Sequence, residues 1–234
     1  MASPQAFPPR APRLVIACRV MEPELNLLAA GAAGLSIVYL DQSLHRTPQD
    51  MAPLIQARID AAGDQVAQVV LGYGLCSNGI AGVRARAAEI IVPKAHDCIA
   101  LFMGSLNRYA ELSAQNPGTY YLTPGWVAEG KDPLGIMEGE YTQRVGRENA
   151  EWVMREELKH YTLLTLIDTG ALPMDALRAR AQANAEFFGM HFQELTGSPE
   201  YFRQLLHGPY PVDNFFRVAP GQEIQPGLAG APAC

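Results

Sequence analysis

The stretch QVVLGYGLCSNGIAG, residues 68–82, decides how the rest of the sequence is interpreted. It begins as a short apolar run of the kind that forms a buried strand. It then continues into a segment rich in glycine, in which Gly72, Gly74 and Gly79 surround Cys76. Glycine is favoured where the backbone bends sharply or approaches another group closely. The stretch therefore predicts a strand that ends in a tight loop carrying a thiol.

Similar apolar runs recur along the chain and alternate with segments of helical spacing. We expect strands at residues 14–17, 35–40, 68–73, 89–93, 119–123, 161–168 and 190–195, and helices at 49–63, 97–113, 148–159, 173–189 and 199–207. Continuous Val, Ile and Leu runs between amphipathic helices are typical of a parallel sheet with helices on both faces. The sequence thus predicts an α/β fold with a mostly parallel sheet and a cleft at the carboxyl ends of its strands.

The composition of the 234-residue chain fits a globular protein, with 48% hydrophobic and 18% charged residues. We expect one α/β domain over residues 13–222, with room for two subdomains around a cleft. Flexible segments are expected at 1–12 and 223–234, which are rich in Pro, Ala and Gly. Whether the strands over residues 119–168 join the first sheet is left open by the sequence.

The charge and hydropathy patterns exclude several classes of function. A formal net charge of −6 argues against nucleic-acid binding, which requires a basic face. The sequence shows neither a signal peptide nor an apolar stretch near the ~20 residues of a membrane span. We therefore expect a cytoplasmic protein without membrane contact, whose cysteines stay reduced. The high hydrophobic content leaves room for a homo-oligomer interface.

Three of the four cysteines lie just beyond the carboxyl ends of three different predicted strands. Cys18 follows the first strand, Cys76 lies in the glycine-rich loop, and Cys98 follows the strand at 89–93, whereas Cys234 lies in the tail. Because ligands of open α/β sheets bind at the carboxyl ends of strands, these three thiols are predicted to share a site. The alternative is that each cysteine packs as a small hydrophobic side chain, as cysteine often does.

A site of three thiolates has two natural occupants. Zinc takes three protein ligands and keeps a fourth position open in catalytic sites. A [4Fe–4S] cluster held by three thiolates leaves one iron free for substrate. The chain contains no C-x-x-C pair, so the spacing matches neither a zinc ribbon nor a ferredoxin.

Polar residues next to these strand ends are candidates for proton transfer and binding. His96 and Asp97 precede Cys98 and are candidate acid–base groups, although Asp97 is equally suited to cap a helix beginning at Cys98. Asp41 and His45 follow the strand at 35–40 and are candidate substrate-binding residues, with a surface histidine as the alternative for His45.

Three further residues are candidates for substrate binding. Gly74 would let the backbone approach a ligand, and Asn78 would either donate a hydrogen bond to it or begin the following helix. Trp126 follows a predicted Pro–Gly turn in YLTPGW, where packing is the competing interpretation. The glycine spacing does not match a dinucleotide-binding or P-loop motif, so neither NAD nor ATP is expected.

These segments together carry a resemblance to a known family. LVIACRVMEPEL, YLDQSLHRTP, LGYGLCSNGIAG, IIVPKAHDCIALFMGS and GTYYLTPGW resemble the domain of unknown function 1638 family, over residues 13–222. Family members typically read Cys-Gly at the glycine-rich loop, where this chain has Cys76–Ser77. The cysteine is kept, and the group that the loop binds is put in doubt.

The resemblance implies a context and no established reaction. Family members resemble partners of corrinoid proteins, of methyltransferases that use corrinoids, and of iron–sulfur proteins that reactivate corrinoids. Three hypotheses follow: a zinc–thiolate enzyme or accessory factor in corrinoid- or folate-linked methyl transfer, the same thiolates holding a [4Fe–4S] cluster that acts as a Lewis acid, or a non-catalytic module that docks on a corrinoid protein.

Overall fold

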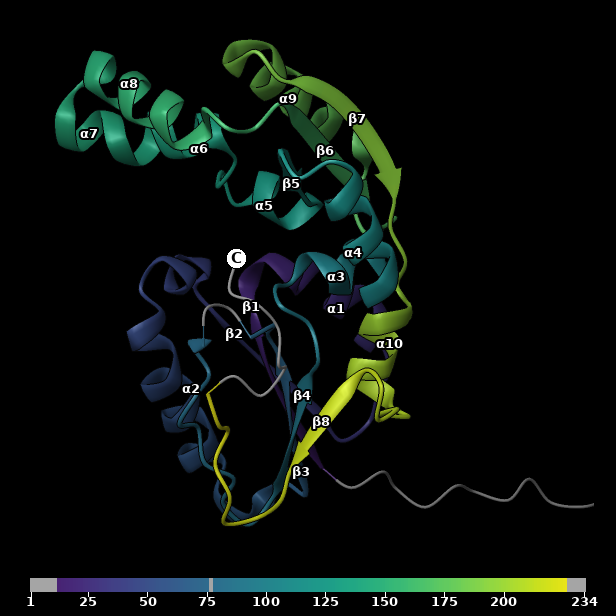
Figure 1. Cartoon of the computed structure of the whole chain (residues 1–234). Helices are drawn as coiled ribbons and strands as arrows, with labels where there is room; N and C mark the ends of the chain where they lie inside the picture. The colour runs from purple at the N-terminus through teal and green to yellow at the C-terminus, as the bar shows by residue number, and fades with distance from the viewer. Residues whose placement is uncertain (1–11, 76–77, 227–234) are drawn as a thin grey trace, which may run out of the picture. The chain divides into compact units, whose positions relative to one another are not determined.

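The computed structural model describes residues 12–75 and 78–226, and the described chain divides into two compact units (Figure 1). Unit 1 contains residues up to Arg19, residues 25–98 and the chain from Arg203 onward. Unit 2 contains Val20–Glu24 and Ile99–Phe202. Cys76 and Ser77, most of the predicted N-terminal segment and most of the predicted tail lie outside the described residues.

Unit 1 is built on a five-stranded sheet in the order β2-β1-β3-β4-β8. Its first four strands are mutually parallel, and β8 runs antiparallel to β4. The strands are β1 (Arg13–Cys18), β2 (Leu35–Leu40), β3 (Gln68–Gly72), β4 (Glu89–Pro93) and β8 (Phe215–Val218). The predicted α/β class with predominantly parallel sheets is confirmed.

The core of unit 1 lies between this sheet and α2 (Pro48–Ala62), which Figure 1 shows along one side of the sheet. Pro48 occupies the first helical turn, where its missing N–H costs nothing. The buried stripe Met51, Ile55 and Ile59 then packs against alternate residues of the strands. Each such aliphatic side chain contributes roughly 1.5–3 kcal/mol on burial, so this stripe fixes α2 on the sheet.

Unit 2 is built on a separate sheet, in which β5, β6 and β7 are all parallel. The three strands are β5 (Thr119–Leu122), β6 (Leu163–Asp168) and β7 (His191–Thr196). The sequence had left open whether the strands over residues 119–168 join the first sheet, and they form a second sheet with β7. The helices of this unit are α3 (Ile99–Met103), α4 (Leu106–Gln115), α5 (Pro124–Ala128), α6 (Pro133–Ile136), α7 (Thr142–Val145), α8 (Arg147–Leu158) and α9 (Met174–Phe188), with a π-helical turn at Met137–Tyr141.

Two helices contain the boundary between the units. They are α1 (Glu22–Ala29), of which residues 22–24 belong to unit 2, and α10 (Glu200–His207), of which residues 200–202 belong to unit 2. The chain therefore passes between the units four times in the described residues, after Arg19, Glu24, Cys98 and Phe202.

The structure corrects two of the predicted elements. The single helix expected over residues 97–113 is two helices, because Gly104 adopts a positive φ of 72° and lies against Ser198. Ser105 then caps α4 by accepting a hydrogen bond from the Arg108 N–H. The Pro–Gly turn expected before Trp126 is the helix α5, which the buried Thr123 caps.

A polar network fixes α6 to α9 inside unit 2. Oδ1 of Asp132, a residue only 1% exposed, accepts hydrogen bonds from Asn184 Nδ2 at 2.6 Å, Arg180 Nε at 2.9 Å and the Gly135 N–H at 3.2 Å. Asn184 in turn accepts a hydrogen bond from the Leu134 N–H at 2.8 Å. The network satisfies buried polar groups that would otherwise be costly to desolvate.

Candidate functional site at the strand ends of unit 1

The carboxyl ends of four neighbouring parallel strands meet at one edge of the sheet in unit 1. Cys18 is the last residue of β1, and its register partner is Leu40, the last residue of β2. β3 lies next to β1 on the other side, and β4 follows β3. The segments that follow these strands therefore leave the sheet at the same edge, at a spacing of about 4.8 Å from strand to strand.

Cys18 and Cys98 both belong to unit 1, and both side chains have intermediate exposure. Cys18 also packs against the hydrophobic core between the sheet and α2. Cys76 lies outside the described residues. Over residues 12–75 and 78–226, no three or more His, Cys, Asp and Glu side chains are grouped to hold a metal ion.

The glycine-rich loop is held against the segment that leads to Cys98. The Leu75 N–H donates a hydrogen bond of 2.8 Å to the Ala95 carbonyl. A Cβ atom placed on Gly74 would lie only 2.7 Å from backbone atoms of Asp97, so this position has no room for a side chain. Glycine is thus required because two backbones approach closely here, two residues before Cys76 in the sequence.

The other candidate residues in the segments after β3 and β4 differ in exposure. His96 is exposed, Asp97 is partly buried, and Asn78 is exposed with a positive φ of 63°. Asparagine tolerates this left-handed conformation better than most residues, which gives Asn78 a structural role besides the predicted hydrogen bond. The predicted capping role of Asp97 assumed a helix beginning at Cys98, whereas α3 begins at Ile99.

The turn after β2 brings Asp41 and His45 to the same edge. Asp41 caps the 3-10 helix Gln42–Arg46 by accepting a 2.8 Å hydrogen bond from the Ser43 N–H. Nδ1 of His45 faces the Gln42 carbonyl oxygen, which fixes Nδ1 as the protonated nitrogen and Nε2 as the acceptor.

The pKa of His45 is lowered from its ordinary value although the residue is exposed. Partial burial of the ring, with the charge of Arg46, lowers the pKa of His45, and the hydrogen bond to Gln42 opposes this effect. A neutral imidazole with an acceptor Nε2 is the form that takes a proton or binds a metal. This observation supports His45 as a binding residue more strongly than the sequence did.

Gln42 is a candidate that the sequence did not reveal. The residue is 3% exposed, and its Oε1 has no hydrogen-bond partner within the described residues. A buried amide oxygen without a partner costs about 1–3 kcal/mol, which a bound donor would recover. The only signal available beforehand was its position two residues after a strand end.

Trp126 belongs to unit 2 and is not brought into the same unit as the cysteines. It lies in α5, and its ring packs against the hydrophobic core of that unit. This placement agrees with the packing interpretation that the sequence offered as the alternative.

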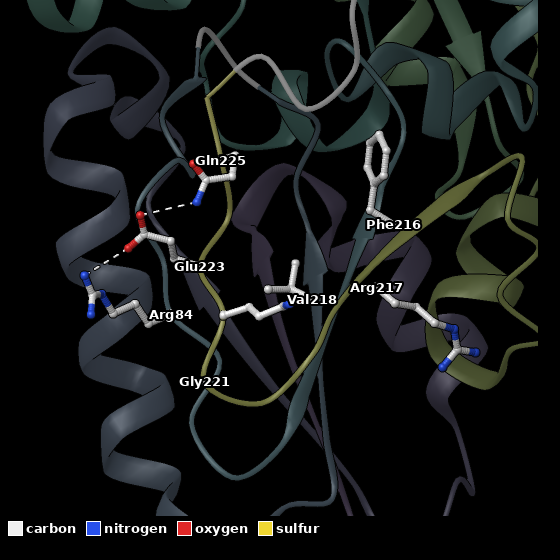
Figure 2. A pocket seen from close by; sticks show the side chains of 8 residues that line it. Arg84, Phe216, Arg217, Val218, Gly221, Glu223 and Gln225 are labelled. Carbon is white, nitrogen blue, oxygen red and sulfur yellow. Dashed lines mark hydrogen bonds and ion pairs between the residues drawn. The ribbon is translucent and has the colours of Figure 1, made fainter.

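A pocket of about 560 Å³ elsewhere in unit 1 is a weaker candidate (Figure 2). It is lined by β8 and the chain after it, together with Arg84 from the segment between β3 and β4. Arg84 is paired with Glu223 at 3.0 Å, which also accepts a hydrogen bond from Gln225. Arg217 is paired with Glu89 at 3.0 Å. Because these charged groups are already paired, the pocket offers a ligand little that is unsatisfied.

Comparison with protein families assigns the chain to one family. The family described as protein of unknown function (DUF1638) matches residues 39–206, and the chain belongs to this family. The matched range includes Cys76, His96, Asp97 and Cys98, whereas Cys18 precedes it. Comparisons with curated proteins and with solved structures found no match. Among the described residues, none of the helices has the length and apolar character needed to span a membrane.

Proposed function

We propose that this protein is a zinc–thiolate enzyme, or an accessory factor, in corrinoid- or folate-linked methyl transfer. The observation that carries the proposal concerns three neighbouring parallel strands of unit 1: Cys18 is the last residue of β1, Cys98 lies in the segment after β4, and Cys76 comes four residues after β3 in the sequence. In this proposal Cys18, Cys76 and Cys98 hold the metal ion. The corrinoid or folate context comes from the resemblance to the family alone.

The chemistry of the donor set suits zinc. Thiolate sulfur is a preferred ligand of zinc, and three protein ligands leave one position for a substrate. Both described cysteines are partly exposed, so a metal ion can reach them from solvent. Zinc bound there would lower the pKa of a substrate thiol and keep it as the thiolate for alkyl transfer.

The residues around the cysteines would manage protons and orient the substrate. His96 is exposed in the turn before Cys98, where a proton can pass to solvent. Asp97 is held in place because its backbone packs against Gly74. On the β2 side, His45 Nε2 would accept a hydrogen bond from the substrate, and Gln42 Oε1 would accept a second one.

The same three thiolates would equally hold a [4Fe–4S] cluster. In that form the protein would be an iron–sulfur protein whose open iron acts as a Lewis acid. The presence of acid-labile sulfide distinguishes the cluster from zinc.

One observation favours a third candidate, a non-catalytic module that docks on a corrinoid protein. The Cys18 side chain packs against the hydrophobic core of unit 1, as a cysteine with only a packing role would. Replacement of Cys18 would then reduce stability and leave metal content unchanged.

The test is metal and sulfide analysis of protein purified without oxygen, with Cys18→Ser, Cys76→Ser and Cys98→Ser compared with Cys234→Ser. We expect about one zinc ion per chain, kept in Cys234→Ser and lost in the other three variants. Iron and acid-labile sulfide in place of zinc would mean that the three thiolates hold a [4Fe–4S] cluster. Metal-free, folded wild-type protein from metal-replete cells would refute the thiolate site and favour the docking module.

A further inference from the structure

Glu24 is a buried acidic residue of unit 2 that the proposed function does not use. The residue is 2% exposed. Its Oε1 accepts a 2.6 Å hydrogen bond from Thr169 Oγ1, in the turn that follows β6. Its Oε2 is buried and has no hydrogen-bond partner within the described residues. An ionised carboxylate accepts several hydrogen bonds, and one side chain supplies far less than the charge requires.

The charges around Glu24 do not compensate for this burial. Burial raises the pKa of Glu24 from 4.5 to about 7, against hydrogen bonds from Thr169 and from its own backbone N–H. No neighbouring charge is among the causes of the shift. The turn carrying Thr169 has one ionisable side chain, Asp168, whose Oδ1 is bound to the Gly170 N–H at 2.8 Å, and α5 has none.

Glu24 belongs to the segment of residues 20–24, which also contacts the rest of unit 2 closely at Val20. Residues 20–24 belong to unit 2, whereas the chain directly before and after them belongs to unit 1. The Val20 carbonyl lies so close to Gly125 of α5 that a Cβ atom on this glycine would overlap it. The segment is therefore a short strap, residues 20–24, fixed at Val20 by backbone contact and at Glu24 by the carboxyl.

We propose that the protonated carboxyl of Glu24 holds this strap on unit 2, and that loss of the proton weakens the attachment. The neutral acid is compatible with a buried site that provides one hydrogen bond, and the carboxylate is not. When the strap detaches, Glu24 enters water, where it ionises readily. Detachment is therefore coupled to release of a proton.

The sign of the coupling follows from the two protonation equilibria. A carboxyl whose pKa is about 7 when docked and about 4.5 when released binds its proton more tightly in the docked state. The docked state is thus most favoured at acidic pH. It loses its advantage between about pH 4.5 and about pH 7 and changes no further above that.

The test is hydrogen exchange of the backbone amides of residues 20–29 in the full-length protein, corrected for the intrinsic effect of pH on exchange. In wild-type protein we expect protection to fall by up to about tenfold for each pH unit between about pH 5 and about pH 7, and then to level off. Amides of α9, in the same unit, provide the internal reference.

Two variants separate Glu24 from a general effect of pH. Glu24→Gln keeps the size and the acceptor for Thr169 but cannot ionise, so its protection should not depend on pH. Glu22→Gln, on the same helix, should respond as the wild type does. Equal pH dependence in Glu24→Gln and wild type, or none in wild type, would overturn the proposal. A carboxyl ¹³C titration of Glu24 with an ordinary glutamate midpoint would overturn it independently.

Discussion

The buried network around Asp132 provides a sharp test of how unit 2 is held together. Asp132→Ala removes the acceptor of three hydrogen bonds and the negative charge that faces Arg180. It also removes the N-cap of α6, because the Asp132 side chain accepts the Gly135 N–H. Loss of a cap costs about 1 kcal/mol, and breaking a buried ion pair costs about 3–5 kcal/mol.

Breaking the Asp132–Arg180 ion pair costs less than breaking a fully buried pair. The Arg180 side chain is 33% exposed and has a second, weaker contact with Glu138 at 3.4 Å, so water and Glu138 take over part of its solvation. Asn184 keeps its hydrogen bond to the Arg180 carbonyl at 2.9 Å. We therefore expect Asp132→Ala to destabilise unit 2 by about 3 kcal/mol. For a chain of this size, this corresponds to a fall in Tm of roughly 6–12 °C.

The chain offers a probe that reports on unit 2 alone. Both of its tryptophans, Trp126 and Trp152, lie in unit 2, so tryptophan fluorescence during urea unfolding follows this unit. The matched control is Glu151→Ala, which breaks an exposed pair with Arg155 and should cost less than about 0.5 kcal/mol. If Asp132→Ala were as stable as Glu151→Ala, the network would contribute no more than a surface ion pair, and our reasoning would be wrong.

Three further predictions concern close backbone contacts and pH. Gly74→Ala places a methyl group against the Asp97 backbone and should destabilise unit 1 by about 1–3 kcal/mol in thermal unfolding followed by circular dichroism; no loss would mean that the two loops separate freely. Gly125→Ala should destabilise unit 2 by a similar amount in the fluorescence assay, whereas Gly139→Ala, which has open space around its Cβ, should not. Glu24→Gln should remove a loss of wild-type stability between about pH 4.5 and about pH 7, worth roughly 3 kcal/mol by pH 8 in urea unfolding; parallel pH profiles would contradict the buried carboxyl.

The strands of the parallel sheets could be predicted because their signal is local. A run such as LVIA or EIIVP is apolar at every position, and it has this pattern because both faces of the strand are covered. The residues at the strand ends followed from the same runs, which is how Cys18 and the loop containing Gly74 were identified. The family membership was predicted from whole segments and is confirmed over residues 39–206.

Features that depend on distant pairing could not be predicted. β8 is four residues long, and its antiparallel partner β4 lies more than 100 residues earlier, so no local pattern marks it. The assignment of β5, β6 and β7 to a second sheet likewise depends on which strands pair with one another, and the sequence of a single strand does not show this. Glu24 appears in EPEL as an ordinary polar residue of a first helical turn, and its burial becomes visible only when Thr169 is placed beside it.

The positions of the two described cysteines connect the proposed site to the way the chain leaves unit 1. The chain first passes to unit 2 after Arg19, which directly follows Cys18. Cys98 is the last residue before the third passage. A metal ion held by both thiolates would therefore restrain two of the four passages, because binding energy gained at the ligands opposes any motion that separates them. Cysteines that only pack would exert no such restraint. Hydrogen exchange at residues 19–24 and 99–103, measured with and without chelator, should therefore change together if the site binds a metal ion, and should not respond to chelator if the cysteines only pack.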